Sequence, residues 1–355
     1  MRICFALSGF HRQDRGAETA LLAVAEQLAR TGDNVTVIGS GKPRAETAYR
    51  FEHVPALPRE KFERFPSLPF LRDETSWEDA SFAFNLTRGG ALNRFDVTIT
   101  CAFPFTSLAL RRARGKHVFV TENGDWPAYS DRSEYRLFDC DGLVCINPEY
   151  YERNRSRWNA ALIPNGVDFE RFRPGRGMRE KFGLPLDKPV VLMVSAFIQS
   201  KRVLAGIEAM AQIPDAFLLV AGNGPMRGEA DALASELIPG RYKRMTLSAD
   251  EMPDLYRSAD VFLHLSKNES FGNVYLEAGA SGLPVVAHDY SITRWIFGNG
   301  AFLSNTDNRA ALTNALRQAL DAGVQPIDDE LKRFAWPAIS TRYREFMESI
   351  PVTAP

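Results

Sequence analysis

The sequence predicts an α/β protein of two Rossmann-like domains, each with a doubly wound parallel sheet, facing each other across a cleft. Its 355 residues are too many for one ordinary core and fit about two domains of ~100–200 residues. Short β-rich runs alternate with helical stretches in both halves of the chain, which is typical of parallel sheets covered by helices. A segment with two prolines and mixed charge, 163–177, interrupts this alternation as an interdomain linker would.

The first half contains five predicted strands and is expected to form a domain over 1–165. Between the first two strands, apolar residues repeat at helical spacing over 16–32, and Gly32 is a typical helix end. The strands are β-branched, apolar runs at 2–8, 34–39, 96–101, 117–121 and 142–147.

The second half repeats the alternation after a linker at 166–177 and is expected to form a domain over 178–337. Its strands are predicted by the same kind of apolar run between turn residues. They are 189–196, 216–222, 243–247, 260–265, 283–288 and 301–304.

The composition is that of a globular protein, with 45% hydrophobic residues, 25% charged residues and a formal net charge of −1. This charge gives no reason to expect a nucleic-acid partner. The four cysteines form no C-x-x-C pair and no histidine cluster has metal-ligand spacing. The longest apolar run, 189–198, is far shorter than the ~20 residues of a spanning helix. The N-terminal run is too short for a signal peptide, so we expect a cytoplasmic protein.

One stretch, ESFGNVYLEAGASG, has the residues of an anion site. It follows the predicted strand 260–265 and predicts a helix over 271–280, with Ser270 near its cap. In open α/β sheets, ligands bind beyond the carboxyl ends of strands, where the N–H groups of helix starts attract phosphate. The N–H groups in question belong to Phe271, Gly272 and Asn273, and the glycine lets an anion approach the backbone closely.

Two glutamates, Glu269 and Glu277, flank this expected phosphate site. Eight helical residues correspond to about 12 Å along the axis and a turn of roughly 80°, a separation similar to the length of a nucleoside diphosphate. A carboxylate accepts two hydrogen bonds and so suits a vicinal diol: Glu277 a ribose, Glu269 a sugar ring. The alternative is that Glu269 is a turn residue and Glu277 belongs to a solvated helix face.

The same stretch resembles the E-x7-E signature of retaining glycosyltransferases of family 4, which have the GT-B fold. Other segments resemble that family's motifs in the same order, so the resemblance covers nearly the whole chain. It implies that a C-terminal helix, 338–355, joins the first domain. The segments are 15–38, 163–174, 254–272 and 334–346.

The resemblance implies roles for single residues. Glu277 should bind the donor ribose, and Glu269 should contact the transferred sugar. Further residues implied to surround the donor are Ser270, Phe271, Gly272, Asn273, Val274, Gly16, Gly222 and Gly224.

The positions that hold the donor diphosphate depart from the family pattern. Lys201 matches the family's lysine, but Ala196 stands where an arginine is usual. A bidentate guanidinium is then missing from its usual place. Arg202 is the proposed substitute; its alternative is a surface cation at a helix.

The first domain departs from the pattern too. Arg15 replaces the first of two glycines, which leaves Gly16. Many relatives have a histidine after the strand 117–121, where the nearest match here is Asn123, beside Glu122. Asn123 is expected to face sugar or acceptor, and ordinary turn chemistry is the equal alternative.

The implied function is transfer of a hexose, with retention, from a nucleoside-diphosphate sugar, by default a UDP-sugar. The acceptor would be a hydroxyl of a glycan, a lipid-linked saccharide or a small molecule. No prosthetic group and no metal are expected, because cationic side chains would neutralise the leaving diphosphate. Two alternatives remain: a nucleotide-sugar epimerase of the same architecture, and a catalytically degenerate protein that only binds a sugar nucleotide.

The segment 59–77 interleaves aromatic and basic residues. It is either a surface that contacts lipid or a loop that packs on the core. At most a peripheral contact with the inner face of the membrane is expected, and the sequence does not predict the oligomeric state.

Overall fold

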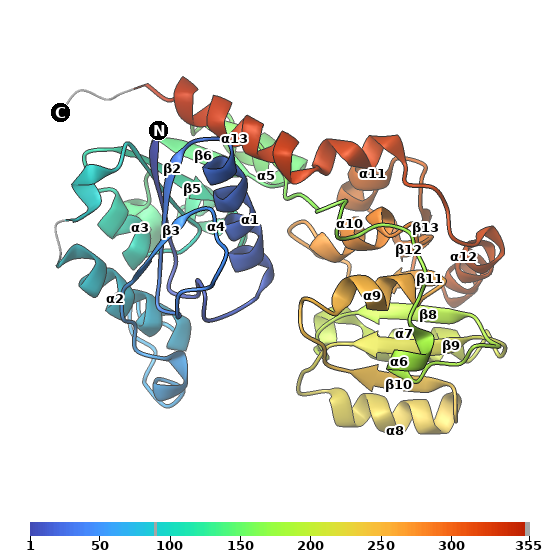
Figure 1. Ribbon diagram of the computed structural model, residues 1–355. Helices are drawn as coiled ribbons and strands as arrows, with labels where there is room; N and C mark the ends of the chain where they lie inside the picture. The colour runs from blue at the N-terminus through green and yellow to red at the C-terminus, as the bar shows by residue number, and fades with distance from the viewer. Residues whose placement is uncertain (89–90, 352–355) are drawn as a thin grey trace. The chain divides into compact units, whose positions relative to one another are not determined.

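The structure is a computed structural model that describes residues 1–88 and 91–351. The chain forms two compact units (Figure 1). Unit 1 comprises Met1–Asn165 and the segment that begins at Trp336, and unit 2 comprises Gly166–Ala335. Both units are α/β, as the sequence predicts.

Unit 1 is built on a seven-stranded sheet with the order β3-β2-β1-β4-β5-β6-β7. All neighbouring strands are parallel. Two strands, β3 and β7, were not predicted, because they are short, half-exposed edge strands without a long apolar run. The strands are β1 (Arg2–Ala6), β2 (Asn34–Gly39), β3 (Arg50–His53), β4 (Val97–Thr100), β5 (Lys116–Val120), β6 (Gly142–Cys145) and β7 (Ala160–Leu162).

Helices flank the sheet of unit 1, and the last one comes from the C-terminal end of the chain (Figure 1). Arg344 of α13 pairs with Asp33 at 2.6 Å, near the end of α1. Of the range 338–355 expected for this helix, residues 352–355 lie outside the described residues. The helices are α1 (Gly16–Arg30), α2 (Glu74–Thr87), α3 (Phe105–Leu110), α4 (Trp126–Tyr129), α5 (Pro148–Asn154) and α13 (Trp336–Ser349), with 3₁₀ turns η1 (Arg59–Lys61), η2 (Ala91–Arg94) and η3 (Ser133–Leu137).

Unit 2 contains a six-stranded parallel sheet with the order β10-β9-β8-β11-β12-β13. All six strands correspond to predicted runs. The order reverses between β8 and β11, as it does between β1 and β4 in unit 1, and such switch points are where α/β sheets bind ligands. The strands are β8 (Val190–Val194), β9 (Phe217–Ala221), β10 (Tyr242–Met245), β11 (Val261–His264), β12 (Val285–His288) and β13 (Phe302–Ser304).

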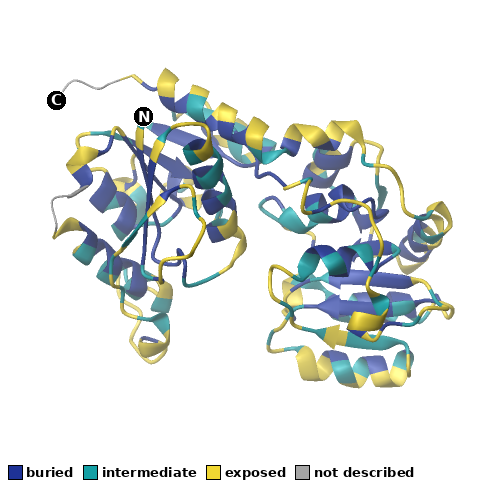
Figure 2. Ribbon diagram, in the orientation of Figure 1, coloured by how far each residue is buried: buried dark blue, intermediate teal, exposed yellow. Residues whose placement is uncertain are grey.

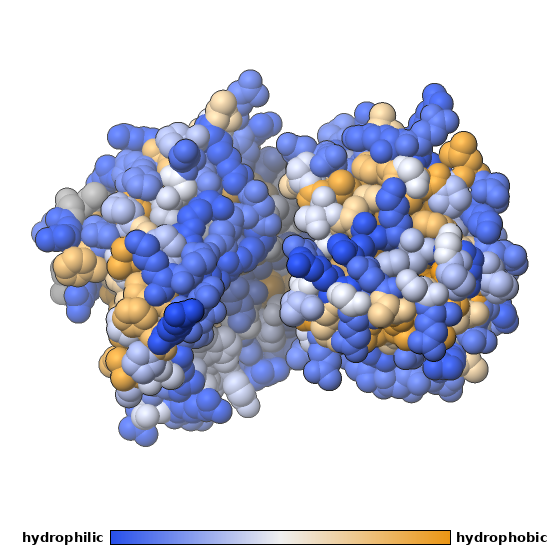
Figure 3. All heavy atoms as spheres, turned by 90° about the horizontal axis from the view of Figure 1, so that it is seen from below, coloured by the Kyte–Doolittle hydropathy of each residue, from blue (hydrophilic) through white to orange (hydrophobic). Residues whose placement is uncertain are grey.

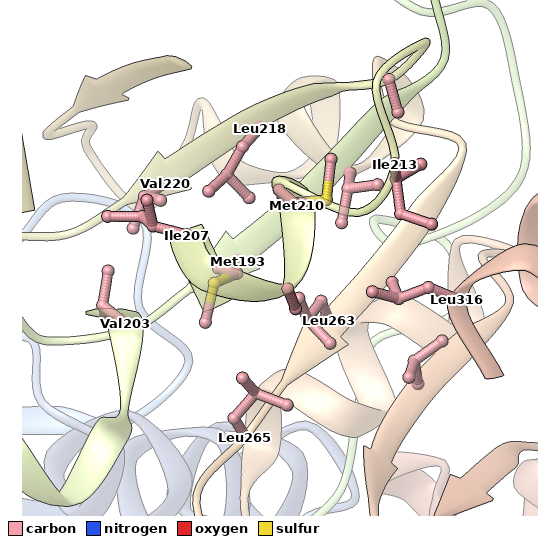
Figure 4. Packing of buried hydrophobic residues seen from close by; sticks show 14 of the residues in the cluster. Met193, Val203, Ile207, Met210, Ile213, Leu218, Val220, Leu263, Leu265 and Leu316 are labelled. Atoms are coloured by element: carbon pink, nitrogen blue, oxygen red, sulfur yellow. The ribbon is translucent and has the colours of Figure 1, made fainter. Parts of the chain in front are cut away.

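The core of unit 2 lies where its helices cover the central strands. The four central strands, β8, β9, β11 and β12, are buried along most of their length (Figure 2). Figure 4 shows Met193 of β8, Val220 of β9 and Leu263 of β11 near Ile207 of α7, and all four side chains are fully buried. The helices are α6 (Arg179–Phe182), α7 (Val203–Met210), α8 (Arg227–Leu237), α9 (Met252–Arg257), α10 (Asn273–Ala280), α11 (Ser291–Phe297) and α12 (Arg309–Ala322), with 3₁₀ turns η4 (Gln199–Lys201) and η5 (Asp329–Phe334).

The aromatic segment 59–77 packs partly on itself. The buried Phe62 stacks on Trp77 with ring centroids 5.4 Å apart, and Phe65 meets both rings edge-on while staying half-exposed.

On the face seen in Figure 3, hydrophobic side chains form separate groups among hydrophilic ones. None of the helices in the described ranges combines the length and the apolar character needed to cross a bilayer.

Candidate functional site

The switch point of the unit 2 sheet brings two predicted site residues together. The chain leaves β8 into the turn η4, which ends at Lys201, and it leaves β11 into the loop that carries Glu269. Because β8 and β11 are neighbours in the sheet, these loops emerge side by side. The Lys201 ammonium donates to Oε1 of Glu269 in a part-buried ion pair.

The Glu269 carboxylate is held in its ionised form. His264 Nε2 lies 2.8 Å from the same Oε1 atom that Lys201 binds. Burial opposes the charge, but the hydrogen bond with His264 and the charge of Lys201 outweigh it and lower the pKa of Glu269 to about 2. Since both contacts use Oε1, the other oxygen, Oε2, is left to accept a hydrogen bond from a ligand.

The helix after Glu269 starts later than the sequence predicts. It begins at Asn273, and Phe271 and Gly272 precede it. The reason is Gly272, whose φ of 85° is left-handed and cannot belong to a right-handed helix. Glu269 and Glu277 therefore do not lie along one helix, and the expected 12 Å spacing does not apply.

The side chains around this helix start divide into buried and accessible ones. Phe271 is buried and packs edge-on against Trp295 and Phe334, so only its backbone faces the site. Gly272 has no room for a side chain, because a Cβ there would come within 2.6 Å of the Tyr275 ring. Ser270, Asn273 and Val274 are partly exposed.

Glu277 lies within α10 and keeps one carboxylate oxygen for a ligand. The hydroxyl of Tyr256 donates to Oε2 at 2.7 Å. Burial raises the pKa of Glu277, although the Tyr256 hydrogen bond and the Arg171 charge act in the opposite direction. A diol that donates a hydrogen bond to Oε1 would offset the cost of burying the carboxylate charge. The ribose role requires such a hydrogen bond.

Arg202 lies next to Lys201 but has a different environment. Its guanidinium donates to the Leu265 carbonyl at 3.2 Å, to Oγ1 and the carbonyl of Thr306 at 2.6 and 3.1 Å, and to Asp307 at 2.9 Å. Ala196 is exposed and offers no donor. These four bonds use the Nη1 and Nη2 groups, so Arg202 could serve a diphosphate through its Nε–H group or by exchanging some of these partners.

Gly222 and Gly224 allow the loop after β9 to contact the loop after β8. A Cβ on Gly222 would lie 2.0 Å from the Ser195 carbonyl oxygen, and one on Gly224 would lie 2.6 Å from that of Phe197. The backbone of Phe197 also donates to Asn223 at 3.0 Å. These glycines thus have a structural role beside the switch point.

Two residues of the unit 2 site were not predicted. His264 is the last residue of β11, a buried apolar strand. The presence of a histidine in such a strand was its only signal in the sequence. Tyr256 lies in the last turn of a short helix, α9, and had no distinguishing signal. No group of three or more possible metal ligands occurs among the residues that the structure describes.

Unit 1 has a cavity of about 570 Å³ at its own switch point. Its walls include residues that follow β1, β4 and β5, and two predicted residues, Gly16 and Asn123, line it. Gly16 is the first residue of α1. The Asn123 side-chain amide makes two long contacts, 3.5 Å to the Cys101 carbonyl and 3.7 Å to its sulfur.

Glu122 also lines this cavity. Its Oε2 accepts a hydrogen bond from Asn165 at 3.1 Å, whereas Oε1 is buried without a partner among the described residues. Burial raises the pKa of Glu122 to about 8, although the Asn165 hydrogen bond lowers it. At neutral pH this carboxyl is mostly protonated and can donate a hydrogen bond.

This shift makes stability depend on pH. Because Glu122 has a pKa of about 8 when folded and about 4.3 in an unfolded chain, the folded protein holds an extra proton between these values. The free energy of unfolding should therefore fall as pH rises through this window. Glu122→Gln should remove that part of the decline, measured as denaturation midpoints across pH. The exposed Glu60 gives the control Glu60→Gln, and parallel profiles for all three proteins would contradict the assignment.

The chain matches two family profiles that together span most of its length. The profile of "Glycosyltransferase Family 4" matches residues 15–171. The profile of "Glycosyl transferases group 1" matches residues 176–335.

Two relatives are similar over half of the chain. The lipopolysaccharide core biosynthesis glycosyltransferase LpsE of Rhizobium meliloti is 32% identical over 51% of this chain and 52% of its own. The GDP-mannose-dependent α-(1-6)-phosphatidylinositol monomannoside mannosyltransferase of Mycolicibacterium smegmatis is 32% identical over 50% of this chain and 53% of its own. The chain therefore spans about half the length of these two relatives.

A solved structure matches the whole fold. HepE of Anabaena, in complex with UDP and glucose, superposes with a TM-score of 0.77 and 18% identity, over 98% of this chain and 100% of HepE. This likeness shows that the two chains share a fold.

Proposed function

We propose that this chain, which belongs to the family 4 glycosyltransferases, transfers a hexose from a nucleoside-diphosphate sugar to an acceptor hydroxyl with retention of configuration. The donor binds to unit 2, at the switch point between β8 and β11. The acceptor binds to unit 1, whose cavity lies at the corresponding switch point. Unit 1 with the C-terminal helix is thus the acceptor domain and unit 2 is the donor domain.

The observation that carries this proposal is the environment of Glu269. An ionised carboxylate, bound on one oxygen by Lys201 and His264, has its second oxygen open to a ligand. That oxygen can accept a sugar hydroxyl, and its negative charge favours positive charge on the sugar ring. The Lys201 ammonium beside it favours the negative charge of a leaving diphosphate.

The proposed reaction needs no protein nucleophile. The bond between the sugar C1 and the β-phosphate oxygen breaks, and the acceptor oxygen bonds to C1 on the same face. The acceptor proton passes to the departing phosphate oxygen. Lys201 and the amino end of α10, at Gly272 and Asn273, stabilise the diphosphate charge, so we propose that no metal takes part.

A UDP-sugar is the proposed donor. The HepE complex supports it, because that protein is described with UDP and glucose. The name of the Mycolicibacterium relative specifies GDP-mannose, so a guanine nucleotide is the alternative to test. The proposed acceptors are hydroxyls of a glycan, a lipid-linked saccharide or a small molecule, in a protein that acts in the cytoplasm or at the inner face of the membrane.

The donor site can be tested through Glu277. Glu277→Ala should weaken donor binding about 10- to 100-fold, because it removes a part-buried hydrogen-bond acceptor. Thermal shifts with a panel of UDP- and GDP-sugars would identify the donor, and calorimetry would give the affinities of both proteins.

The control is Glu229→Ala, which removes an exposed carboxylate from the first turn of α8. It should bind the donor as the unchanged protein does. Equal affinities for Glu277→Ala and the unchanged protein would refute the ribose role. Release of a sugar epimer without any acceptor would instead indicate an epimerase, and tight binding without turnover a sugar-nucleotide-binding protein.

A further inference from the structure

The cavity of unit 1 contains charged side chains that the proposed transfer does not yet use. Its volume of about 570 Å³ is within the range of pockets that hold small ligands. Several charged groups on its walls are already paired within unit 1. Arg72 pairs with Glu134, and Asp79 accepts hydrogen bonds from the hydroxyl and the backbone N–H of Thr106.

Two arginines on the wall of this cavity have unused donors. Arg15 is largely exposed, and its guanidinium makes no hydrogen bond or ion pair with any residue in the described ranges. Arg59 reaches Glu78 with Nη2 at 3.3 Å, but its Nε is buried and has no partner among the described atoms. Both guanidiniums therefore keep N–H groups for a ligand.

The charges of these two arginines act on each other. The buried Glu78 carboxylate already faces two guanidiniums, that of Arg12 at 2.6 Å and that of Arg59. Arg15 has no such partner. Partial burial and, next, the charge of Arg59 lower the pKa of Arg15. An anion between Arg15 and Arg59 would offset this repulsion.

The wall of the same cavity includes a carboxyl group, that of Glu18, which can form a hydrogen bond with a sugar hydroxyl. Glu18 is 5% exposed, and its Oε2 is buried without a partner in the described part of unit 1. Burial raises the pKa of Glu18, as it does for Glu122. A sugar hydroxyl can exchange hydrogen bonds with either carboxyl, whatever its protonation state.

We infer that the unit 1 cavity binds a saccharide acceptor that carries an anionic group, a phosphate or a carboxylate. Arg15 and Arg59 bind the anion, and Glu18 and Glu122 bind hydroxyls of the sugar. This inference rests on the proposed function, in which unit 1 takes the acceptor. It narrows the acceptor class from any hydroxyl compound to acidic or phosphorylated sugars.

The test compares three sugars without donor present: glucose, glucose 6-phosphate and glucuronic acid. Binding is followed by saturation-transfer NMR and by tryptophan fluorescence, because Trp126 lines the cavity and is 41% exposed. At least one charged sugar should bind about tenfold more tightly than glucose, since its anion forms charge-assisted hydrogen bonds. Preference for glucose 6-phosphate indicates a phosphate, and preference for glucuronic acid a carboxylate.

Arg15→Gln removes no hydrogen bond of the described protein and should fold normally. It should reduce the preference for the charged sugar to about twofold or less and leave glucose binding unchanged. Arg15→Lys should keep part of the preference for the charged sugar. Arg30→Gln, at the other end of α1, is the matched control. Equal binding of all three sugars, binding of none of them, or a full preference in Arg15→Gln would each overturn the inference. Failure of the donor assignment would appear separately, as missing nucleotide binding.

Discussion

Glu269→Gln should lower kcat for sugar transfer about 10²- to 10³-fold at saturating donor, since it removes a preorganised charge at the reaction centre. Glutamine has nearly the same shape, so the change tests the charge rather than the packing. With a pKa of about 2, the carboxylate is ionised at any working pH, and its charge becomes useful as the sugar acquires oxocarbenium character. Initial rates with the donor found by thermal shift would measure the effect.

The matched control is Glu208→Gln. Glu208 belongs to α7 of the same unit, and within the described residues its carboxylate pairs only with Arg309, at 3.4 Å on the surface. This variant should have the kcat of the unchanged protein. If the kcat of Glu269→Gln stayed within about threefold of the unchanged protein, the assignment of Glu269 to the reaction centre would be wrong.

Lys201→Ala should lower kcat about 100-fold, because in the proposed mechanism the leaving diphosphate loses a cation that stabilises its charge. Arg202→Ala should have a comparable effect if Arg202 replaces the arginine missing at Ala196. The two variants therefore need to be compared under identical conditions, by steady-state kinetics and by donor affinity.

Asp307→Ala separates the two possible roles of Arg202. It removes one partner of the guanidinium, which lies at 2.9 Å, without removing the cation itself. If Arg202 serves the diphosphate, this variant should keep its activity. If Arg202 instead fixes the loop after β13, Asp307→Ala and Arg202→Ala should both lower the melting temperature, and only Lys201→Ala should lower kcat.

Most of the fold could be predicted because apolar runs identify central strands directly. Buried strands such as β8 and β9 consist almost wholly of apolar residues, and such runs are typical of parallel sheets. The edge strand β3 of unit 1 lacks this signal, since it has the sequence RFEH and is only half-buried. The start of α10 was misplaced by two residues because the left-handed conformation of Gly272 is not visible in helical periodicity.

The site could be predicted only in part. Glu269, Glu277 and Lys201 were proposed as site residues from spacing and from resemblance to a family. The pairing of Lys201 with Glu269 depends on β8 lying next to β11, an order that a sequence does not state. His264 and the arginines of the unit 1 cavity depend in the same way on tertiary neighbours: Arg15 and Arg59 are far apart in the chain but line one cavity.

The C-terminal helix α13 has a consequence for the order in which the protein is completed during synthesis. Lys116 of β5 donates to the Met347 carbonyl at 2.9 Å, and Arg344 binds Asp33, so α13 closes unit 1. All of unit 2 is translated before this helix. At about 5–20 residues per second, translation of unit 2 delays the synthesis of α13 by a time on the order of 10–30 s. On the ribosome, unit 2 therefore has its whole sequence available before unit 1 does, although unit 1 begins first.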